Sequence, residues 1–309
     1  MAELSDFTGW PRGPLSIAIG IFDGVHIGHQ ALIRQAAARA AERGGTPLAT
    51  TFHPLPIQVL APGAPPSVLT DIDDRMRLLH SAGAHDVVVF HFTKEFSEQE
   101  ADEFVRRVAR AGEVRQIFVG EDFRFGHDRR GDIRTLITAG PEYGFEVTVA
   151  TPVTLDGGVV SSTRVRNALL AGDVENAARL LGRRYTVSGA VIPGAMHGKA
   201  LGFPTIALAV PPARLLPRDG IYAVSLGIGG RQIAAAASLG VRPTFGGSER
   251  TLEAYLLDWD GDVFDAKIEA TFVRRLRDEL RFETAAELSE QIARDVDATR
   301  AALRDPPRS

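Results

Sequence analysis

The chain from Leu15 to about Leu181 alternates short apolar runs with segments of helical periodicity. Runs such as LSIAIG and DVVVF are apolar throughout, as in the strands of a parallel sheet that helices cover on both faces. This order predicts βαβ units and a Rossmann-like domain of the α/β class. Ligands of such a domain are expected at the carboxyl ends of its strands.

The pattern gives definite limits to these elements. The expected strands are Leu15–Gly20, Leu48–Phe52, Asp86–Phe90, Gln116–Val119 and Phe145–Ala150. The expected helices are Gly28–Glu42, Asp71–Ser81, Ser97–Ala111 and Asp132–Tyr143. The third helix is predicted to open with a capping box formed by Ser97 and Glu100.

After Leu181 the pattern changes to alternating runs separated by glycine and proline, typical of an antiparallel sandwich or small barrel. The expected strands are Tyr185–Val191, Ile221–Leu226, Gln232–Leu239, Leu252–Leu257 and Lys267–Phe272. A last helix, Thr284–Ala302, opens with a capping box of Thr284 and Glu287. The change predicts two domains, 1–182 and 183–309.

Composition excludes several classes of protein. With no cysteine, the chain has no disulfide framework, no thiolate zinc site and no cysteine nucleophile. Residues 1–182 contain 18 lysines and arginines against 23 aspartates and glutamates, a net charge of −5, and residues 183–309 contain 17 against 16, a net charge of +1. Neither part has the basic excess of a duplex-DNA binder. Apolar stretches such as Ile233–Ala237 are too short to span a membrane. The first residues do not resemble a secretory signal, so a cytoplasmic location without membrane or nucleic-acid partners is expected.

The strongest local signal is GIFDGVHIGH, residues 20–29, between the first strand and the first helix. His26 and His29 can both face the helix N-terminus, where free N–H groups and the helix dipole attract phosphate. Gly28 would let a phosphate approach the backbone. A histidine pair that caps the helix, or part of a metal site, remains the alternative. The chain has neither a Walker P-loop nor a G-x-G-x-x-G fingerprint after the first strand.

Two further clusters are candidates for ligand contacts. Ser161, Ser162, Thr163 and Arg164 lead into a helix and suit the outer phosphates of ATP, although an ordinary N-cap explains them as well. In GEDFRFG, residues 120–126, Asp122, Phe123 and Phe125 could hold a planar ring and a polar tail. A β-turn with core phenylalanines is the alternative.

Taken together, these motifs resemble the bacterial bifunctional riboflavin kinase/FAD synthetase family over nearly the whole chain. GIFDGVHIGHQ, FVGEDFRFG and SSTRVRNAL resemble the nucleotidyltransferase signatures, in the expected order. GKALGFPT, VRPTFGG, LEAYLLDWDGDVF and RLRDELRF resemble the flavokinase module. Three ordered motifs in one half and four in the other make coincidence improbable.

The resemblance implies transfer of AMP from ATP to FMN in the first half, giving FAD. His26 and His29 would bind the α-phosphate within a site shaped by Gly20, Phe22, Asp23 and Gly28. Ser161, Ser162, Thr163 and Arg164 would hold the other phosphates, Asp122 would help to place nucleotide or flavin, and Mg²⁺ would bridge phosphate oxygens.

For the second half, the resemblance implies phosphorylation of riboflavin to FMN by ATP. Glu253 would be the base, Thr205 would bind magnesium and phosphate, and Gly194, Gly198 and Lys199 would belong to a flap over the nucleotide.

Two departures from the family pattern affect these expectations. His53 and Leu55 stand where the family has an acidic residue and a histidine, and Ala207 replaces the asparagine of P-T-A-N. An alanine supplies neither the carbonyl acceptor nor the amide donor of asparagine. We therefore expect a weak, specialised or inactive kinase half. A flavin-binding or regulatory second module, or a nucleotidyltransferase for another phosphorylated, flavin-like substrate, is the alternative.

Overall fold

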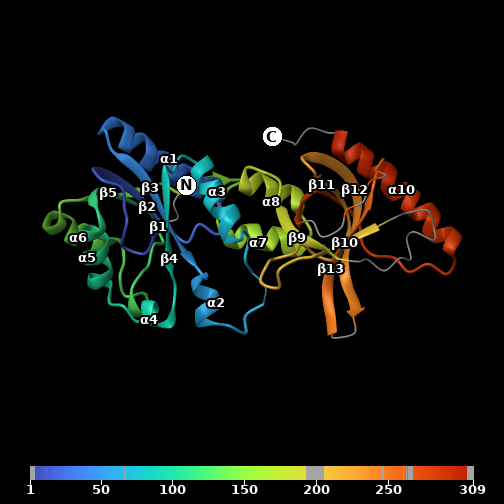
Figure 1. Ribbon diagram of the computed structural model, residues 1–309, viewed down its shortest axis with the longest axis horizontal. Coiled ribbons are helices and arrows are strands. Elements are labelled where there is room, and N and C mark those ends of the chain that lie inside the picture. Colours follow the sequence, from blue (N-terminus) through green and yellow to red (C-terminus); the bar gives the residue numbers. More distant parts are fainter. Residues whose placement is uncertain are drawn as a thin grey trace. The chain divides into compact units, whose positions relative to one another are not determined.

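Contacts between residues divide the chain into two compact units, Met1–Ser162 and Thr163–Ser309. The computed structural model describes residues 4–65, 67–192, 205–244, 247–259, 261, 263 and 267–304 (Figure 1). The first unit is a parallel sheet with helices, and the second is an antiparallel barrel with helices. The expected fold class is confirmed.

The sheet of the first unit has the strand order β1-β4-β3-β2-β5-β6, and all its pairs are parallel. Its strands are β1 (Leu4–Ser5), β2 (Pro14–Ile19), β3 (Thr46–His53), β4 (Asp86–His91), β5 (Glu113–Gly120) and β6 (Glu146–Ala150). The five strands expected from the sequence are confirmed, with ends that differ by at most a few residues.

Helices cover both faces of this sheet, as the apolar strands predict. They are α1 (Ile27–Glu42), α2 (Pro56–Leu60), α3 (Ile72–Ser81), α4 (Lys94–Ser97), α5 (Ala101–Ala111) and α6 (Ile133–Tyr143). Buried side chains of α1 and α3 form one apolar cluster with the sheet, and those of α5 and α6 form another. Figure 1 shows α5 and α6 lying together, apart from α1 and α3.

The expected start of the third helix is wrong. Ser97 ends the short helix α4, and its hydroxyl donates to the carbonyl of Lys94. Thr93 caps α4, whereas α5 begins after Glu100 without a side-chain cap. The starts of α4 and α5 lie within a few residues of each other, and the side chain that caps a helix is Thr93, before α4, and not Ser97.

The fourth expected helix begins as predicted, with Asp132 as its N-cap. The carboxylate accepts hydrogen bonds from the backbone N–H groups of Thr135 and Arg134. The bond from Thr135 lowers the pKa of Asp132 most, with help from Arg134 and Arg124. Between β5 and α6 lies a 3₁₀ turn, His127–Arg129, and after β6 a small hairpin of β7 (Thr154–Leu155) and β8 (Gly158–Val159).

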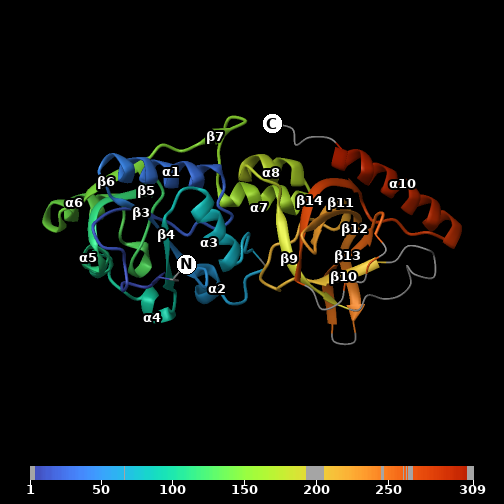
Figure 2. The same cartoon turned by 45° about the horizontal axis from the view of Figure 1, so that its top comes forward.

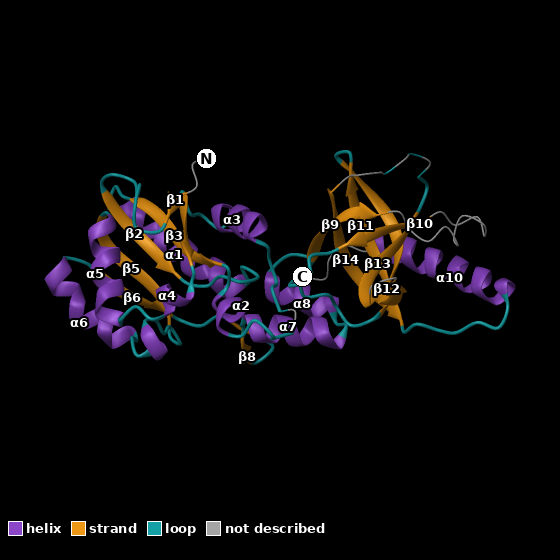
Figure 3. Ribbon diagram, turned by 60° about the horizontal axis from the view of Figure 1, so that its bottom comes forward, coloured by secondary structure: helices purple, strands orange, loops and turns teal. Residues whose placement is uncertain are grey.

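The second unit contains a closed antiparallel barrel in the order β10-β13-β12-β11-β14-β9 (Figure 3). Its strands are β9 (Thr186–Ile192), β10 (Thr205–Ala209), β11 (Gly220–Ile228), β12 (Arg231–Thr244), β13 (Gly247–Leu256) and β14 (Lys267–Arg277). Closure leaves no strand edge exposed to pairing with another chain. The predicted barrel is confirmed, and among its six described strands β10 is the one that the hydrophobic pattern did not indicate.

The described residues of this unit include the helices α7 (Ser162–Ala171, from Thr163 on), α8 (Val174–Leu181) and α10 (Ala285–Arg304), and α10 lies along the barrel (Figure 2). The predicted capping box of α10 is present, since Thr284 accepts from the N–H of Glu287 and Glu287 accepts from that of Thr284. Arg277 of β14 holds α10 through a two-pronged ion pair with the buried Asp295.

The change of pattern near residue 182 falls inside the second unit, because α7 and α8 pack against the barrel. The carbonyl of Leu169 in α7 accepts a hydrogen bond from the N–H of Arg218, before β11. Glu175 of α8 pairs with Arg274 of β14 at 3.3 Å. The boundary between compact units therefore lies one helix pair earlier than the change in hydrophobic pattern.

Candidate active site

The carboxyl ends of β2 and β5 mark the place where the strand order reverses. β3 and β4 follow β2 to one side, whereas β5 and β6 lie to the other, and Ala18 of β2 pairs with Phe118 of β5. In open parallel sheets, the crevice at such a point is where ligands bind. The loop after β2 carries the two histidines, so the strongest sequence motif lies at this point.

The loop from Gly20 to His26 has a strained backbone. Phe22, Gly24 and Val25 all have positive φ angles, of 51°, 85° and 40°. Glycine adopts this region freely, but a β-branched valine does so at a cost that the surrounding structure must offset. A Cβ at Gly20 would lie 2.8 Å from the ring of Phe22, so glycine is needed for the ring to fold back over the strand end.

Asp23 holds this loop to its neighbours. Its carboxylate is 1% exposed and accepts hydrogen bonds from the N–H groups of Leu69 and Thr70, both at 3.0 Å. Its backbone carbonyl accepts the hydroxyl of Ser162 at 2.8 Å. The side chain thus joins the loop after β2 to the segment that precedes α3, and its expected contact with nucleotide stays a prediction.

His26 and His29 lie together at the N-terminus of α1. His26 is the N-cap, and its Nδ1 accepts the backbone N–H of His29 at 3.3 Å. The two rings stack with centroids 3.5 Å apart and 19° between their planes, and the ring of Phe22 meets that of His29 edge-on. The first turn contains no acidic residue that would offset the positive helix end.

The hydrogen bond to Nδ1 fixes the tautomer of His26. A nitrogen that accepts an N–H carries no proton, so the proton of the neutral ring resides on Nε2. Nε2 of the neutral ring is therefore a hydrogen-bond donor at the N-terminus of α1. The structure thus gives His26 the capping role of the alternative interpretation, and contact of the pair with a phosphate stays a prediction.

Gly28 makes room for the histidine. A Cβ at this position would lie 3.2 Å from Cε1 and Nδ1 of His26 and 3.7 Å from the carbonyl oxygen of Val160. The predicted reason for this glycine was close approach of a phosphate to the backbone. The contacts show that it lets the His26 ring pack flat against the first turn of α1.

Asp122 lies at the end of the neighbouring strand. It is exposed, and its Oδ1 would be 3.3 Å from a Cβ on Gly120, the last residue of β5. Phe123 is half-buried, whereas Phe125 is buried and packs on Phe104 with ring centroids 5.4 Å apart. Asp122 is thus available to a ligand at the strand ends. Phe125 is a core residue, as in the alternative interpretation.

The cluster at 161–164 begins α7. Ser162 is the first residue of that helix and is tied to the loop after β2 by its bond to Asp23. Thr163 and Arg164 follow in the first turn, where Thr163 is exposed and Arg164 half-buried, and both belong to the second unit. Ser162 is therefore joined directly to the histidine loop.

Sequence reasoning missed three residues that support the loop: Thr51, Thr70 and Arg75. The hydroxyl of Thr51 donates to the carbonyl of Ile21 at 2.7 Å, and that of Thr70 accepts the N–H of Gly24 at 3.0 Å. Arg75 is 1% exposed and lies between the two threonines. Nothing in the hydrophobic pattern distinguishes these residues from ordinary strand and helix positions.

In the second unit, Glu253 and Thr205 lie on adjacent strands of the barrel. Glu253 of β13 pairs with Ala207 of β10, and Thr205 pairs with Tyr255, two residues further along β13. These residues alternate with Leu252 and other fully buried residues of the interior, so they share the outer face. The register thus brings two of the expected kinase residues together. Gly194, Gly198 and Lys199 lie outside the described residues.

Comparison with known proteins decides the family. The family model for FAD synthetase matches residues 11–164, and that for riboflavin kinase matches residues 181–303. The bifunctional riboflavin kinase/FMN adenylyltransferase of Pseudomonas fluorescens is 39% identical over 285 residues, which cover 92% of this chain and 91% of that one. This chain belongs to the bifunctional riboflavin kinase/FMN adenylyltransferase family.

Other relatives agree over the same length. The family member of Escherichia coli K12 is 37% identical over 289 residues, which cover 92% of this chain and 91% of the relative. A solved structure from Streptococcus pneumoniae, described as a macrolide-efflux protein, has a TM-score of 0.88 at 29% identity and covers 97% of this chain and 99% of its own. The resemblance read from the motifs is confirmed.

The departures from the family pattern now have positions. His53 is exposed at the end of β3, while Leu55 is 2% exposed just before α2, where Gln58 accepts its N–H at 2.8 Å. Ala207, in place of the family asparagine, is 3% exposed and stands opposite Glu253.

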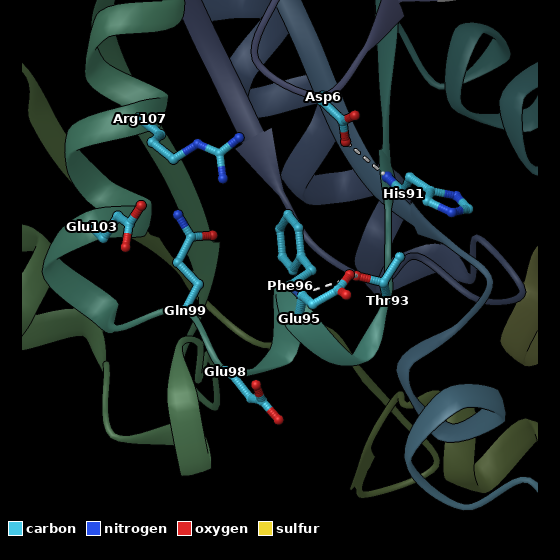
Figure 4. Close-up of a pocket in the computed structure, with 9 residues that line it drawn as sticks. All are labelled: Asp6, His91, Thr93, Glu95, Phe96, Glu98, Gln99, Glu103 and Arg107. Atoms are coloured by element: carbon cyan, nitrogen blue, oxygen red, sulfur yellow. Dashed lines mark hydrogen bonds between the residues drawn. The ribbon is translucent and has the colours of Figure 1, made fainter.

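A hollow of about 480 Å³ on the first unit contains none of the family's motif residues (Figure 4). It is lined by side chains around the end of β4, α4 and α5: Asp6, His91, Thr93, Glu95, Phe96, Glu98, Gln99, Glu103 and Arg107. Asp6 accepts the N–H of His91, and Thr93 donates to Glu95. Most of its acidic side chains are exposed and solvated, so we assign the hollow no part in the family's chemistry.

Two searches of the described residues bear on cofactors and membranes. No group of three or more histidine, aspartate or glutamate side chains could hold a metal ion in the described ranges. Among the described helices, none is long and apolar enough to cross a membrane.

Proposed function

We propose that the first unit transfers AMP from ATP to FMN, giving FAD and pyrophosphate. The observation that carries the proposal is the stacked pair of His26 and His29 at the N-terminus of α1, at the reversal of the strand order. Both family membership and the anion-attracting helix end support it.

In the proposed reaction, a phosphate oxygen of FMN attacks the α-phosphorus of ATP. The new P–O bond forms as the bond to the β-phosphate oxygen breaks, and pyrophosphate departs. Nε2–H of His26 and the imidazole of His29 donate to the α-phosphate oxygens, whose charge must be stabilised in the transition state. Ser161, Ser162, Thr163 and Arg164 are assigned to the departing phosphates, and Asp122 to placing the nucleotide or flavin.

The second unit is proposed to transfer the γ-phosphate of ATP to the ribityl 5′-hydroxyl of riboflavin, giving FMN and ADP. Glu253 accepts the hydroxyl proton as the phosphate is transferred. We propose that this step is slow, because Ala207 leaves the position opposite Glu253 without an amide.

Mg²⁺ is proposed to neutralise the phosphates in both reactions. Thr205 is the protein ligand assigned to it in the second unit, since a hydroxyl oxygen suits this cation and the residue lies near Glu253 in register. We keep the functional parts at 1–182 and 183–309, close to the limits of the two family models. A cytoplasmic location and the absence of nucleic-acid partners stay predictions.

A direct test supplies the full chain with Mg-ATP and either riboflavin or FMN, and resolves the products by chromatography. We expect rapid FAD formation from FMN and slow FMN formation from riboflavin. Rapid phosphorylation of riboflavin would contradict the impaired kinase. Flavin binding by the second unit without ATP consumption would make it a binding module. If pyrophosphate were released from ATP in the presence of another phosphorylated flavin but not of FMN, the assigned substrate would be wrong.

A further inference from the structure

We propose that Arg75 is a positioning residue for adenylyl transfer, which acts on the histidine pair through Thr51 and Thr70. We call these three residues the arginine–threonine network. The inference rests on the proposed function of the first unit for its kinetic test. Its structural test, which observes the histidines directly, is independent of that function.

Arg75 joins three backbone segments from inside the protein. One terminal nitrogen donates to the hydroxyl of Thr51 at 3.2 Å and to the carbonyl of Phe52 at 2.9 Å. The other donates to the carbonyl of Thr70 at 3.1 Å. A guanidinium that is 1% exposed is costly to bury, so its bonds to these acceptors must offset the loss of water.

The network reaches the strained loop at two points. The hydroxyl of Thr51 donates to the carbonyl of Ile21, directly before Phe22. Thr70 accepts the N–H of Gly24 through its hydroxyl, and its own N–H donates to Asp23. The positive φ angles of Phe22 and Val25 thus lie between segments that Arg75 ties together.

Arginine also sets the direction of these hydrogen bonds. A guanidinium has only donors, so the hydroxyl of Thr51 must use a lone pair for Arg75 and its proton for Ile21. The planar fork of Arg75 serves acceptors on two sides at once, which the single ammonium of a lysine does less well. Removing the guanidinium would free the Thr51 hydroxyl to rotate and would leave the Phe52 and Thr70 carbonyls without this donor.

The network affects the proposed reaction through the position of His26. This residue directly follows Val25, and the place of its Nε2 depends on the path of the strained loop. A displacement of about 1 Å in a catalytic donor can cost about 10²-fold in rate. The network therefore fixes where the histidine donors lie.

The test compares Arg75→Met with Arg77→Met in the full chain. Arg77 lies two residues further on α3 and is exposed, so its substitution removes the same group without touching the network. We expect Arg75→Met to lower kcat for FAD formation about 10²-fold per folded molecule, with KM for ATP changed less than about threefold. Arg75→Lys should recover part of the loss, and Arg77→Met should stay within about twofold of the parent.

A second readout is the ¹⁵N spectrum of the histidine side chains, with His26 and His29 assigned from their variants. We expect these signals to shift in Arg75→Met and to be unchanged in Arg77→Met. A merely structural role would lower the melting temperature but leave the kcat of folded molecules and both signals at parental values, and that result would overturn the proposal. Should the parent make no FAD, the proposed function fails, while the spectra still decide the role of Arg75.

If Arg75→Met does not fold, Thr51→Val takes its place. This nearly isosteric change removes only the link between Arg75 and Ile21, and we expect it to lower kcat roughly three- to tenfold and to shift the His26 signal. Parental kcat and an unshifted signal in Thr51→Val would contradict the proposal.

Discussion

His26 combines two roles that a single substitution can separate. Its Nδ1 caps α1, and its Nε2–H is the donor that we propose for the α-phosphate. Asparagine is a good N-cap, but its shorter side chain does not bring its amide N–H₂ to the position of Nε2. We expect His26→Asn to keep the parental melting temperature within a few degrees and to slow FAD formation about 10²–10³-fold.

Two variants control this prediction. His26→Ala should lose the same rate and, in addition, about 1 kcal/mol of stability with the cap. His29→Ala should slow the reaction on the same scale without loss of the cap, because only its backbone N–H enters the capping bond. Parental rates in both His26→Asn and His29→Ala would refute the assignment of the histidines.

At Gly28, stability and activity should change in opposite directions. Alanine favours a helix over glycine by up to about 1 kcal/mol, so Gly28→Ala should not destabilise α1 by propensity. The added Cβ would press on the His26 ring at 3.2 Å and displace it. We expect an unchanged or higher melting temperature with FAD formation slowed about tenfold, measured on the same preparation. A normal rate would show that the ring tolerates the shift.

The histidine pair could be found from sequence, whereas its support could not. H-x-G-H between a strand and a helix has a local chemical meaning at the N-terminus. Arg75 and Arg77 are, in contrast, two arginines of one helix, and only the packing of α3 against the sheet buries the first and exposes the second. Asp23 shows the same limit, because its buried bonds to Leu69 and Thr70 join segments far apart in the chain.

Among the elements, periodicity located the long strands and helices, since each buries one continuous apolar face. It failed where tertiary context decides. The strand β10 has only the residues Thr205–Ala209, and its pairing with β13 and β9 comes from closure of the barrel. Ser97 carried a good capping signal, but the chain had already begun a helix at Thr93.

Gln99, between α4 and α5, is expected to cost stability. Its side chain is 9% exposed, and neither its carbonyl nor its amide has a hydrogen-bond partner in the described part of the chain. A buried polar group without a partner costs about 1–3 kcal/mol. Gln99→Met, of similar shape, should therefore raise the free energy of unfolding by about 1–2 kcal/mol in calorimetry.

Gln116→Met is the matched control for that substitution. Gln116 is more deeply buried, at 1% exposed, and its amide donates to Glu146 at 3.1 Å, whereas its carbonyl has no partner in the described part of the chain. Loss of this bond should lower stability or leave it unchanged. A stability gain in both variants would mean that hydrophobic burial, and not the missing partner of Gln99, is responsible.

At the scale of the whole molecule, the two units support their sites in different ways. The first places loops at the carboxyl ends of parallel strands and fixes them with buried polar bonds. The second places side chains on the outer face of a barrel by strand register. Strand register fixes the positions of these side chains. One substitution on the outer face of the barrel can therefore remove a contact that no neighbouring loop replaces.

Ala207 is the place to test this difference. An asparagine there would stand directly opposite Glu253 and return the amide of the family motif. Because one hydrogen bond to a charged group is worth about 1.5–3 kcal/mol, Ala207→Asn should speed riboflavin phosphorylation about tenfold or more. FAD formation from FMN in the first unit should not change. Ala209→Asn, an exposed position two residues along the same strand, is the control and should alter neither rate. A parental kinase rate in a well-folded Ala207→Asn would show that the missing asparagine does not limit the second unit.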